Sequence, residues 1–213
     1  MITIHHLNRS RSERIVWLAE ELGLPYTLVR HQRDSVTLRA PETLWAINPL
    51  GKSPVIEDDG VIVAESGAIV EYVLEKYGNG RLRPAPDDPQ WPIYLHWMHA
   101  AESTLMLAPM VDFLTKMTGA RSDLLTGFVG GEYATVMGYL DTQVAAHEFI
   151  VGNSFTGADI MVAFTLRMMD MELFPGSGLA LQVALKDYPA AKAYLDRLFA
   201  RPAWLRTMIQ IGE

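Results

Sequence analysis

Residues 48–72, which read NPLGKSPVIEDDGVIVAESGAIVEY, constrain the fold of this chain more than any other stretch. Two short apolar runs flank Asp59-Gly60, and this dipeptide is a strong signal for the turn of a β-hairpin. A helical pattern follows the second run. Ser66 precedes that pattern and is a good N-cap, because its hydroxyl can accept an otherwise unpaired backbone N–H. The stretch therefore predicts a hairpin that leads into a helix.

The end of this hairpin carries polar groups suited to a small anion. Glu65 and Ser66 lie at the N-terminus of the predicted helix, where the helix dipole and free backbone N–H groups attract negative charge. Lys52 and Pro54 lie just upstream, on the strand that the hairpin returns beside this helix. We therefore expect a polar pocket here that binds a small carboxylate.

The first 78 residues alternate between strand and helix patterns. A helix with Ile15, Leu18 and Leu22 on one face follows a first apolar strand. The predicted strands cover residues 2–7, 26–30, 53–57 and 61–64. The first predicted helix ends near residue 22, and two more cover residues 41–47 and 66–77. Their order (strand, helix, strand, helix, strand, strand, helix) predicts a mixed sheet with crossover connections, in a thioredoxin-like α/β domain.

The rest of the chain has helical patterns. Residues 79–90 are rich in Gly, Pro and Asp and form a predicted linker. Single helices are expected over residues 92–117 and 122–148. Thr156 and Asp159 resemble the capping box of a third helix. The predicted parts are an α/β domain over residues 1–78, a linker over 79–90 and an all-helical domain over 91–213.

Composition excludes several classes of protein. Of the 213 residues, 49% are hydrophobic, which is ample for a buried core. The formal net charge of −7 argues against a nucleic-acid partner, because such a binder is usually basic. No secretory signal or membrane-length apolar run is evident, so we expect a cytoplasmic protein with no membrane partner. The chain has no cysteine, which excludes a cysteine nucleophile.

Two segments resemble a known family, the cytosolic glutathione transferases. Residues 48–55, NPLGKSPV, resemble the family's segment at its cis-proline. Residues 65–69, ESGAI, resemble the glutamate–serine segment that holds the γ-glutamyl end of glutathione, and the spacing of the two segments matches. The resemblance is strongest over residues 1–77 and points to bacterial-type, theta-like members that use a serine. It implies a thioredoxin-like domain followed by a C-terminal helical bundle.

The resemblance implies two cations for the glycine carboxylate of glutathione. Lys52 is expected to neutralise this carboxylate, although a solvated loop lysine is the ordinary alternative. Arg39 falls where theta-like members carry a histidine near the same carboxylate, so the residue type differs while a positive charge is retained.

The resemblance also implies partners for the rest of glutathione. Ser53 is expected to offer its backbone N–H and C=O to the cysteinyl part, which requires a cis Ser53–Pro54 bond. Glu65 is expected to pair with the γ-glutamyl ammonium group, and Ser66 to bind the γ-glutamyl carboxylate. Without a ligand, these two residues would form an ordinary helix start.

A hydroxyl group is expected to stabilise the glutathione thiolate. Ser10 precedes Arg14 by four residues, as in the serine-type members of the family, and is the first choice. Asn8 and Ser12 are the alternatives, because a shift of the loop register would exchange them with Ser10. Ser10 and Glu13 also fit the capping box S-x-x-E, so Ser10 has a structural alternative as a helix cap.

His96, His99 and Glu102 are spaced three residues apart on one predicted helix. We predict no metal site there, because a mononuclear site needs more ligands in a different cluster. In related enzymes an acid on this helix reaches the glutathione of the partner subunit, which suggests that role for Glu102.

The function implied by the resemblance is glutathione transfer. Glutathione is the expected co-substrate, and its thiolate would attack a small hydrophobic electrophile between the two domains of a homodimeric detoxification enzyme. Glutathione-dependent isomerisation or dehalogenation at the same site is the enzymatic alternative. A glutathione-binding protein without catalysis is the alternative from another class, because a fold does not fix a function.

Overall fold

The structure is a computed structural model that describes residues 1–171 and 180–212. The chain forms two compact units: the first combines Met1–Leu82 with the segment from Phe199 onward, and the second lies between Arg83 and Leu198. Within the described residues, no helix has the length and apolar character that a membrane crossing requires.

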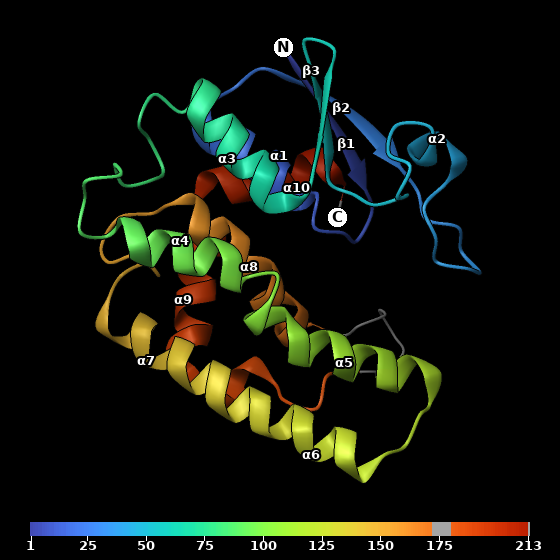
Figure 1. Ribbon diagram of the computed structural model, residues 1–213, viewed down its shortest axis with the longest axis vertical. Helices are drawn as coiled ribbons and strands as arrows, with labels where there is room; N and C mark the ends of the chain where they lie inside the picture. Colours follow the sequence, from blue (N-terminus) through green and yellow to red (C-terminus); the bar gives the residue numbers. More distant parts are fainter. Residues whose placement is uncertain (172–179, 213) are drawn as a thin grey trace. The chain divides into compact units, whose positions relative to one another are not determined.

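A four-stranded sheet forms the centre of the first unit (Figure 1). Its strands are β1 (Ile2–Leu7), β2 (Tyr26–His31), β3 (Val55–Asp58) and β4 (Val61–Ala64), in the order β2-β1-β3-β4. Strands β1 and β2 are parallel, whereas β3 is antiparallel to both β1 and β4. Asp59 and Gly60 form the turn between β3 and β4, with φ angles of 50° and 83°. The predicted hairpin, mixed sheet and thioredoxin-like α/β fold are confirmed.

The core of the first unit lies between the sheet and its helices. These helices are α1 (Glu13–Leu22), α2 (Glu42–Trp45), α3 (Ser66–Tyr77) and α10 (Pro202–Ile211). The central strands, α1 and α3 supply apolar side chains with no exposed surface, among them Ile4, Val16, Leu18, Ile56, Ile69 and Val70. This core fixes the strand ends that carry the polar residues predicted from the sequence.

Helix α10 belongs to the first unit although it is the last helix of the chain. The ring of Trp204 lies 4.9 Å from the ring of Trp17 on α1, and it stacks on Phe199 at 4.2 Å. An ion pair of 2.6 Å joins Arg201, just before α10, to Glu21 on α1. The predicted helical domain over residues 91–213 includes this segment, whereas the structure groups it with the first unit.

The second unit is helical, as predicted. Its helices are α4 (Trp91–Ala100), α5 (Thr104–Thr118), α6 (Asp123–Glu132), a π-helical turn (Tyr133–Met137), α7 (Gly138–Ala146), α8 (Gly157–Asp170), a 3₁₀ turn (Leu185–Asp187) and α9 (Pro189–Phe199). The predicted helix over residues 122–148 is confirmed as α6, the π turn and α7 in succession. The single helix predicted over residues 92–117 is wrong, because Ser103 leaves helical geometry and its hydroxyl donates to the carbonyl of His99 at 2.9 Å.

The predicted capping box at the start of α8 is confirmed. The Asp159 carboxylate accepts the backbone N–H of Thr156 at 2.7 Å and that of Ile150 at 2.9 Å. It also accepts the hydroxyl of Tyr194 at 2.6 Å. Asp159 is completely buried, and its hydrogen bonds join α8 to α9 and to the preceding loop.

Candidate functional site

The register of the strands brings three polar segments to one end of the sheet. His5 on β1 pairs with Val55 on β3, and Val55 pairs with Ala64 on β4. Beyond this row lie the end of β1, Pro54 before β3, and Glu65 after β4. The loop after β1, the proline bond and the N-terminus of α3 therefore meet at the same end of the sheet (Figure 1).

The backbone before β3 is held in a defined turn. The bond between Ser53 and Pro54 is cis, as predicted. The Ser53 hydroxyl donates to the carbonyl of His5 at 3.1 Å, and the Asn48 side chain donates to the carbonyl of Lys52 at 2.9 Å. The Lys52 side chain itself is exposed. Its ammonium group is therefore accessible to a carboxylate.

Helix α3 begins at Ser66, and Glu65 occupies the N-cap position. The prediction of Ser66 as the N-cap is therefore wrong by one residue. Glu65 has φ 74° and ψ 125°, a backbone conformation that is rare for a residue other than glycine. Ser66 is buried while Glu65 is exposed. Since the first turn of a helix has unpaired N–H groups, this end of α3 presents hydrogen-bond donors beside Ser66.

The loop after β1 contains two serine hydroxyls in contact. Ser10 Oγ lies 2.7 Å from Ser12 Oγ and accepts the backbone N–H of Ser12 at 3.2 Å. Ser12 has no exposed surface, whereas Ser10 is 5% exposed. Ser12 Oγ also accepts the backbone N–H of Leu7 at 3.1 Å and lies 2.9 Å from His6 Nδ1. Ser12 is thus the inner hydroxyl of the pair and Ser10 the outer one.

The Ser10 side chain does not cap helix α1. Helix α1 begins at Glu13, its N-cap residue is Ser12, and this N-cap makes no side-chain capping bond. The Ser10 hydroxyl bonds within the preceding turn, while the Ser10 carbonyl accepts the N–H of Glu13 at 3.3 Å. The Ser10 side chain therefore has a position separate from helix capping.

Asn8 is tied to the segment that follows β2. Its side-chain oxygen accepts the backbone N–H of Arg33 at 2.8 Å, and its carbonyl accepts Arg33 Nε at 3.1 Å. The next residue, Arg9, has φ 51°. The Asn8 carboxamide oxygen is thus used to shape the loop, and this loop presents Ser10.

Two further predicted residues belong to neither the loop after β1, the proline turn nor the start of α3. Arg39 is exposed in the connection between β2 and α2, where its carbonyl accepts the N–H of Asp34 at 2.9 Å. Glu102 is exposed between α4 and α5 in the second unit. Its predicted role involves a partner subunit and stays a prediction. Among the described residues, no group of three or more His, Asp or Glu side chains is arranged to hold a metal.

Two histidines that were not predicted as site residues, His5 and His6, lie at the end of β1. Both are buried, at 4% and 2% exposure, although neighbours on a strand point to opposite faces. His6 contacts Ser12, and His5 Nδ1 lies 3.1 Å from His31 Nε2. Adjacent histidines in a mostly apolar strand were the available signal, because a buried imidazole needs hydrogen-bond partners.

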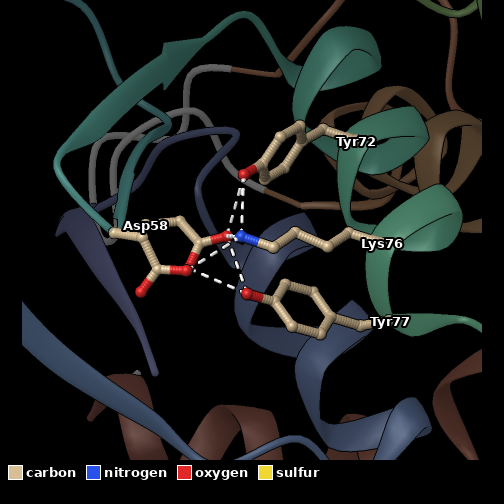
Figure 2. A network of polar contacts seen from close by, with 5 residues as sticks. Asp58, Tyr72, Lys76 and Tyr77 are labelled. Carbon is tan, nitrogen blue, oxygen red and sulfur yellow. Dashed lines mark hydrogen bonds and ion pairs between the residues drawn. The ribbon is translucent and has the colours of Figure 1, made fainter.

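A second polar cluster fixes the helix that carries Ser66 (Figure 2). The buried carboxylate of Asp58, at the end of β3, accepts Lys76 Nζ at 2.6 Å and the hydroxyls of Tyr72 and Tyr77 at 2.9 and 2.7 Å. Burial alone would raise the pKa of Asp58, but these hydrogen bonds and the lysine charge outweigh it and lower that pKa. The cluster anchors α3 to the hairpin at three points.

Comparisons with known protein families match both parts of the chain. Residues 1–75 match the family model described as glutathione S-transferase, N-terminal domain. Residues 130–202 match the one described as glutathione S-transferase, C-terminal domain.

Individual relatives give the same result. Glutathione S-transferase 3 of Schizosaccharomyces pombe is 37% identical over 180 residues, which cover 78% of this chain and 73% of the relative. The crystal structure of a glutathione S-transferase from Actinobacillus pleuropneumoniae superposes with a TM-score of 0.84 at 30% identity, and covers 100% of this chain and 93% of that one. A sphingomonad glutathione S-transferase complexed with glutathione has the same fold, with a TM-score of 0.77 at 21% identity over 99% of this chain and 98% of that one.

Proposed function

Because this chain belongs to the glutathione S-transferase family of enzymes, we propose that it joins the glutathione thiolate to a small hydrophobic electrophile. The observation that carries this proposal is the meeting of Ser10, the cis Ser53–Pro54 bond and the Glu65–Ser66 pair at one end of the sheet. Each of these three segments supplies binding groups for a different part of the glutathione tripeptide.

The two ends of glutathione carry different charged groups and need different binding partners. The exposed ammonium of Lys52 suits the glycine carboxylate, and the exposed guanidinium of Arg39 is a second cation for it. The Glu65 carboxylate suits the γ-glutamyl ammonium group. Ser66 and the N–H groups of the first turn of α3 suit the γ-glutamyl carboxylate. Between these ends, the backbone of Ser53 pairs with the cysteinyl part.

We assign Ser10 as the residue whose hydroxyl binds the glutathione sulfur. A free thiol has a pKa of about 8.5, so most of it is protonated at neutral pH. A hydroxyl that donates to the sulfur stabilises the thiolate and lowers this pKa, and each unit corresponds to about 1.4 kcal/mol. Ser10 is preferred over Ser12, which has no exposed surface. Asn8 is the alternative donor through its side-chain NH2 group, since the bond to Arg33 uses only its side-chain oxygen.

The reaction is a nucleophilic substitution or addition at carbon. The thiol proton passes to solvent, and the sulfur electron pair forms a carbon–sulfur bond. With an aryl halide, the carbon–halogen bond then breaks and the halide leaves with its electron pair. We propose that this protein is a cytoplasmic detoxification enzyme and acts as a homodimer. In the dimer, Glu102 would reach the glutathione of the partner subunit.

The test combines binding and turnover in one preparation of the full chain. Calorimetry with glutathione is followed by a turnover assay with 1-chloro-2,4-dinitrobenzene. Binding together with turnover is expected. Binding without turnover of several electrophile classes would favour a non-catalytic binding protein, and release of halide or isomer without a stable conjugate would favour the alternative reactions. Absence of glutathione binding would overturn the proposal.

Two variants assign the residues. Ser10→Ala is expected to lower kcat about 10- to 100-fold with little change in Kd, because a hydrogen bond to a charged group contributes about 1.5–3 kcal/mol. Ser35→Ala, at an exposed loop serine, is the matched control and should have no effect. Lys52→Met is expected to weaken glutathione binding about tenfold, whereas Lys186→Met, at an exposed lysine of the second unit, should not.

A further inference from the structure

A row of three buried polar side chains leads from β1 to the proposed thiolate donor. His6 Nδ1 lies 2.9 Å from Ser12 Oγ, and Ser12 Oγ lies 2.7 Å from Ser10 Oγ. His6, Ser12 and Ser10 are 2%, 0% and 5% exposed. Both distances are short enough for hydrogen bonds, so protons must be ordered along the row.

The number of hydrogens in the row limits how they can be arranged. Each serine hydroxyl has one hydrogen to donate and two lone pairs to accept with. Ser12 Oγ already accepts the backbone N–H of Leu7 at 3.1 Å. Ser10 Oγ already accepts the backbone N–H of Ser12 at 3.2 Å. Ser12 Oγ also lies 3.3 Å from the carbonyl oxygen of Leu7, which is a possible acceptor for its hydrogen. The contacts between the three side chains are shorter, at 2.7 and 2.9 Å, and their direction remains to be assigned.

One direction leaves the Ser10 hydrogen free for a ligand. If Ser10 donates to the thiolate, it must accept from Ser12 at their mutual contact. Ser12 then has no hydrogen left for His6 or for the Leu7 carbonyl, so His6 Nδ1 must donate to Ser12 Oγ. In this arrangement both oxygens accept two hydrogen bonds and donate one, which is their full capacity.

We propose that His6 is a positioning residue of this site, whose Nδ1–H donates to Ser12 and thereby directs the Ser10 hydroxyl toward the glutathione sulfur. This inference rests on the proposed function, and it adds a residue that does not itself touch the substrate. The opposite tautomer reverses the row: Ser12 donates to His6 Nδ1, the Ser10 hydroxyl turns to Ser12, and the thiolate loses its donor.

The first measurement reads the His6 tautomer directly. Long-range ¹H–¹⁵N correlation NMR on the glutathione complex of the full chain distinguishes a protonated from an unprotonated Nδ1. A proton on His6 Nδ1 is expected. An unprotonated Nδ1 in this complex would overturn the inference, and this result does not depend on whether any variant folds.

The second measurement is the pKa of bound glutathione, followed by thiolate absorbance across pH. His6→Leu is expected to raise this pKa by about one unit, which corresponds to a tenfold smaller thiolate fraction below it, and to lower kcat similarly with Kd unchanged. His6→Asn offers an N–H donor near the position of Nδ1 and should recover most of the loss. His147→Leu, at an exposed histidine of the second unit, is the matched control and should behave like the parent protein.

A double-mutant cycle separates this inference from the proposed function. Once Ser10 is alanine, a further His6→Leu change should have no additional effect on the thiol pKa, because His6 acts through Ser10. Additive effects would overturn the positioning role. If Ser10→Ala alone leaves the thiol pKa unchanged, the assignment of Ser10 fails and the inference fails with it. If Ser10→Ala has its effect and His6→Leu has none, only the inference fails.

Discussion

The Nδ1 atom of His5 lies 3.1 Å from the Nε2 atom of His31 in the interior of the first unit. Glu57 continues the row on one side, with its carboxylate 2.7 Å from His5 Nε2. Thr43 continues it on the other, with its hydroxyl 3.0 Å from His31 Nδ1. The carboxylate accepts from His5 Nε2–H, so His5 Nδ1 accepts from His31 Nε2–H and His31 Nδ1 accepts from Thr43. This row joins three strands to α2.

The His31 side of this row predicts a loss of stability in mild acid. Burial, together with unfavourable electrostatic interactions with His5 and His6, lowers the pKa of His31 in the folded protein. In the unfolded chain His31 binds a proton with a pKa of about 6.5, whereas in the folded chain it binds a proton only at lower pH. The free energy of unfolding therefore falls as pH drops below about 6.5. Urea unfolding at pH 7.5 and 5.5 measures this difference.

A His31→Gln variant tests whether His31 causes that dependence. Glutamine does not titrate, so part of the decrease in stability between pH 7.5 and 5.5 should disappear, even if the variant is less stable at both values. His99→Gln, at an exposed histidine of α4, should keep the parent profile. An unchanged pH dependence in His31→Gln would show that other groups are responsible.

The Asp58 cluster (Figure 2) predicts that Lys76 stabilises the first unit. Lys76→Met removes the cation 2.6 Å from a carboxylate with no exposed side-chain surface, while Tyr72 and Tyr77 keep their hydrogen bonds. Because Lys76 is partly exposed, we expect a smaller loss of stability than for a fully buried ion pair. Chemical unfolding of the variant and the parent protein measures this loss.

The pH profile gives the same cluster a second test. The pKa of Asp58 is lowered in the folded protein, so its contribution to stability is present above about pH 4 and is lost as pH falls further. Asp58→Asn should flatten the profile in this acid range. Asp123→Asn, at an exposed acid of α6, should leave it steep. Equal profiles for the two variants would refute the assignment.

The backbone of Glu65 predicts opposite effects on stability and binding. A non-glycine residue at φ 74° is strained by about 1–3 kcal/mol, and glycine adopts this conformation without a Cβ clash. Glu65→Gly is therefore expected to raise the free energy of unfolding by up to about 1 kcal/mol, after the greater flexibility of the unfolded chain is subtracted. It should also weaken glutathione binding about tenfold or more, because the carboxylate proposed to bind the ammonium group is lost.

Glu65→Gln separates these two effects. It removes the charge and keeps the side chain, so it should weaken glutathione binding without any gain in stability. Calorimetry and thermal unfolding of both variants complete the comparison. A Glu65→Gly protein that binds glutathione as tightly as the parent would contradict the role proposed for Glu65.

Local sequence signals predicted the features of the site that depend on neighbours along the chain. Asp59-Gly60 identified the hairpin, because that dipeptide favours positive φ angles. The left-handed conformation of Glu65 was missed, since it is imposed by the surrounding fold rather than by residue type. The contact of His6 with Ser12 was also missed, because it depends on how the loop returns to the strand.

The position of α10 illustrates the same limit. One face of this helix is apolar, and the structure buries Trp204 and Ile211 there. Periodicity cannot show which surface covers that face, because any apolar surface of matching shape would serve. Order along the chain suggested the helical domain, whereas the aromatic contact with Trp17 places α10 in the first unit.

This contact predicts that the end of the chain stabilises the domain proposed to bind glutathione. Trp204→Ala should lower the free energy of unfolding of the first unit by about 3–5 kcal/mol, because a 5%-exposed ring between Trp17 and Phe199 leaves a cavity. Leu205→Ala is the matched control on the same helix: its side chain is 54% exposed, and its removal should cost less than about 0.5 kcal/mol. Urea unfolding followed by NMR signals of the backbone amides of β1 and α1 reports on the first unit. Similar losses in the two variants would mean that α10 contributes little through its buried face, and that polar contacts such as the Arg201–Glu21 ion pair hold it instead.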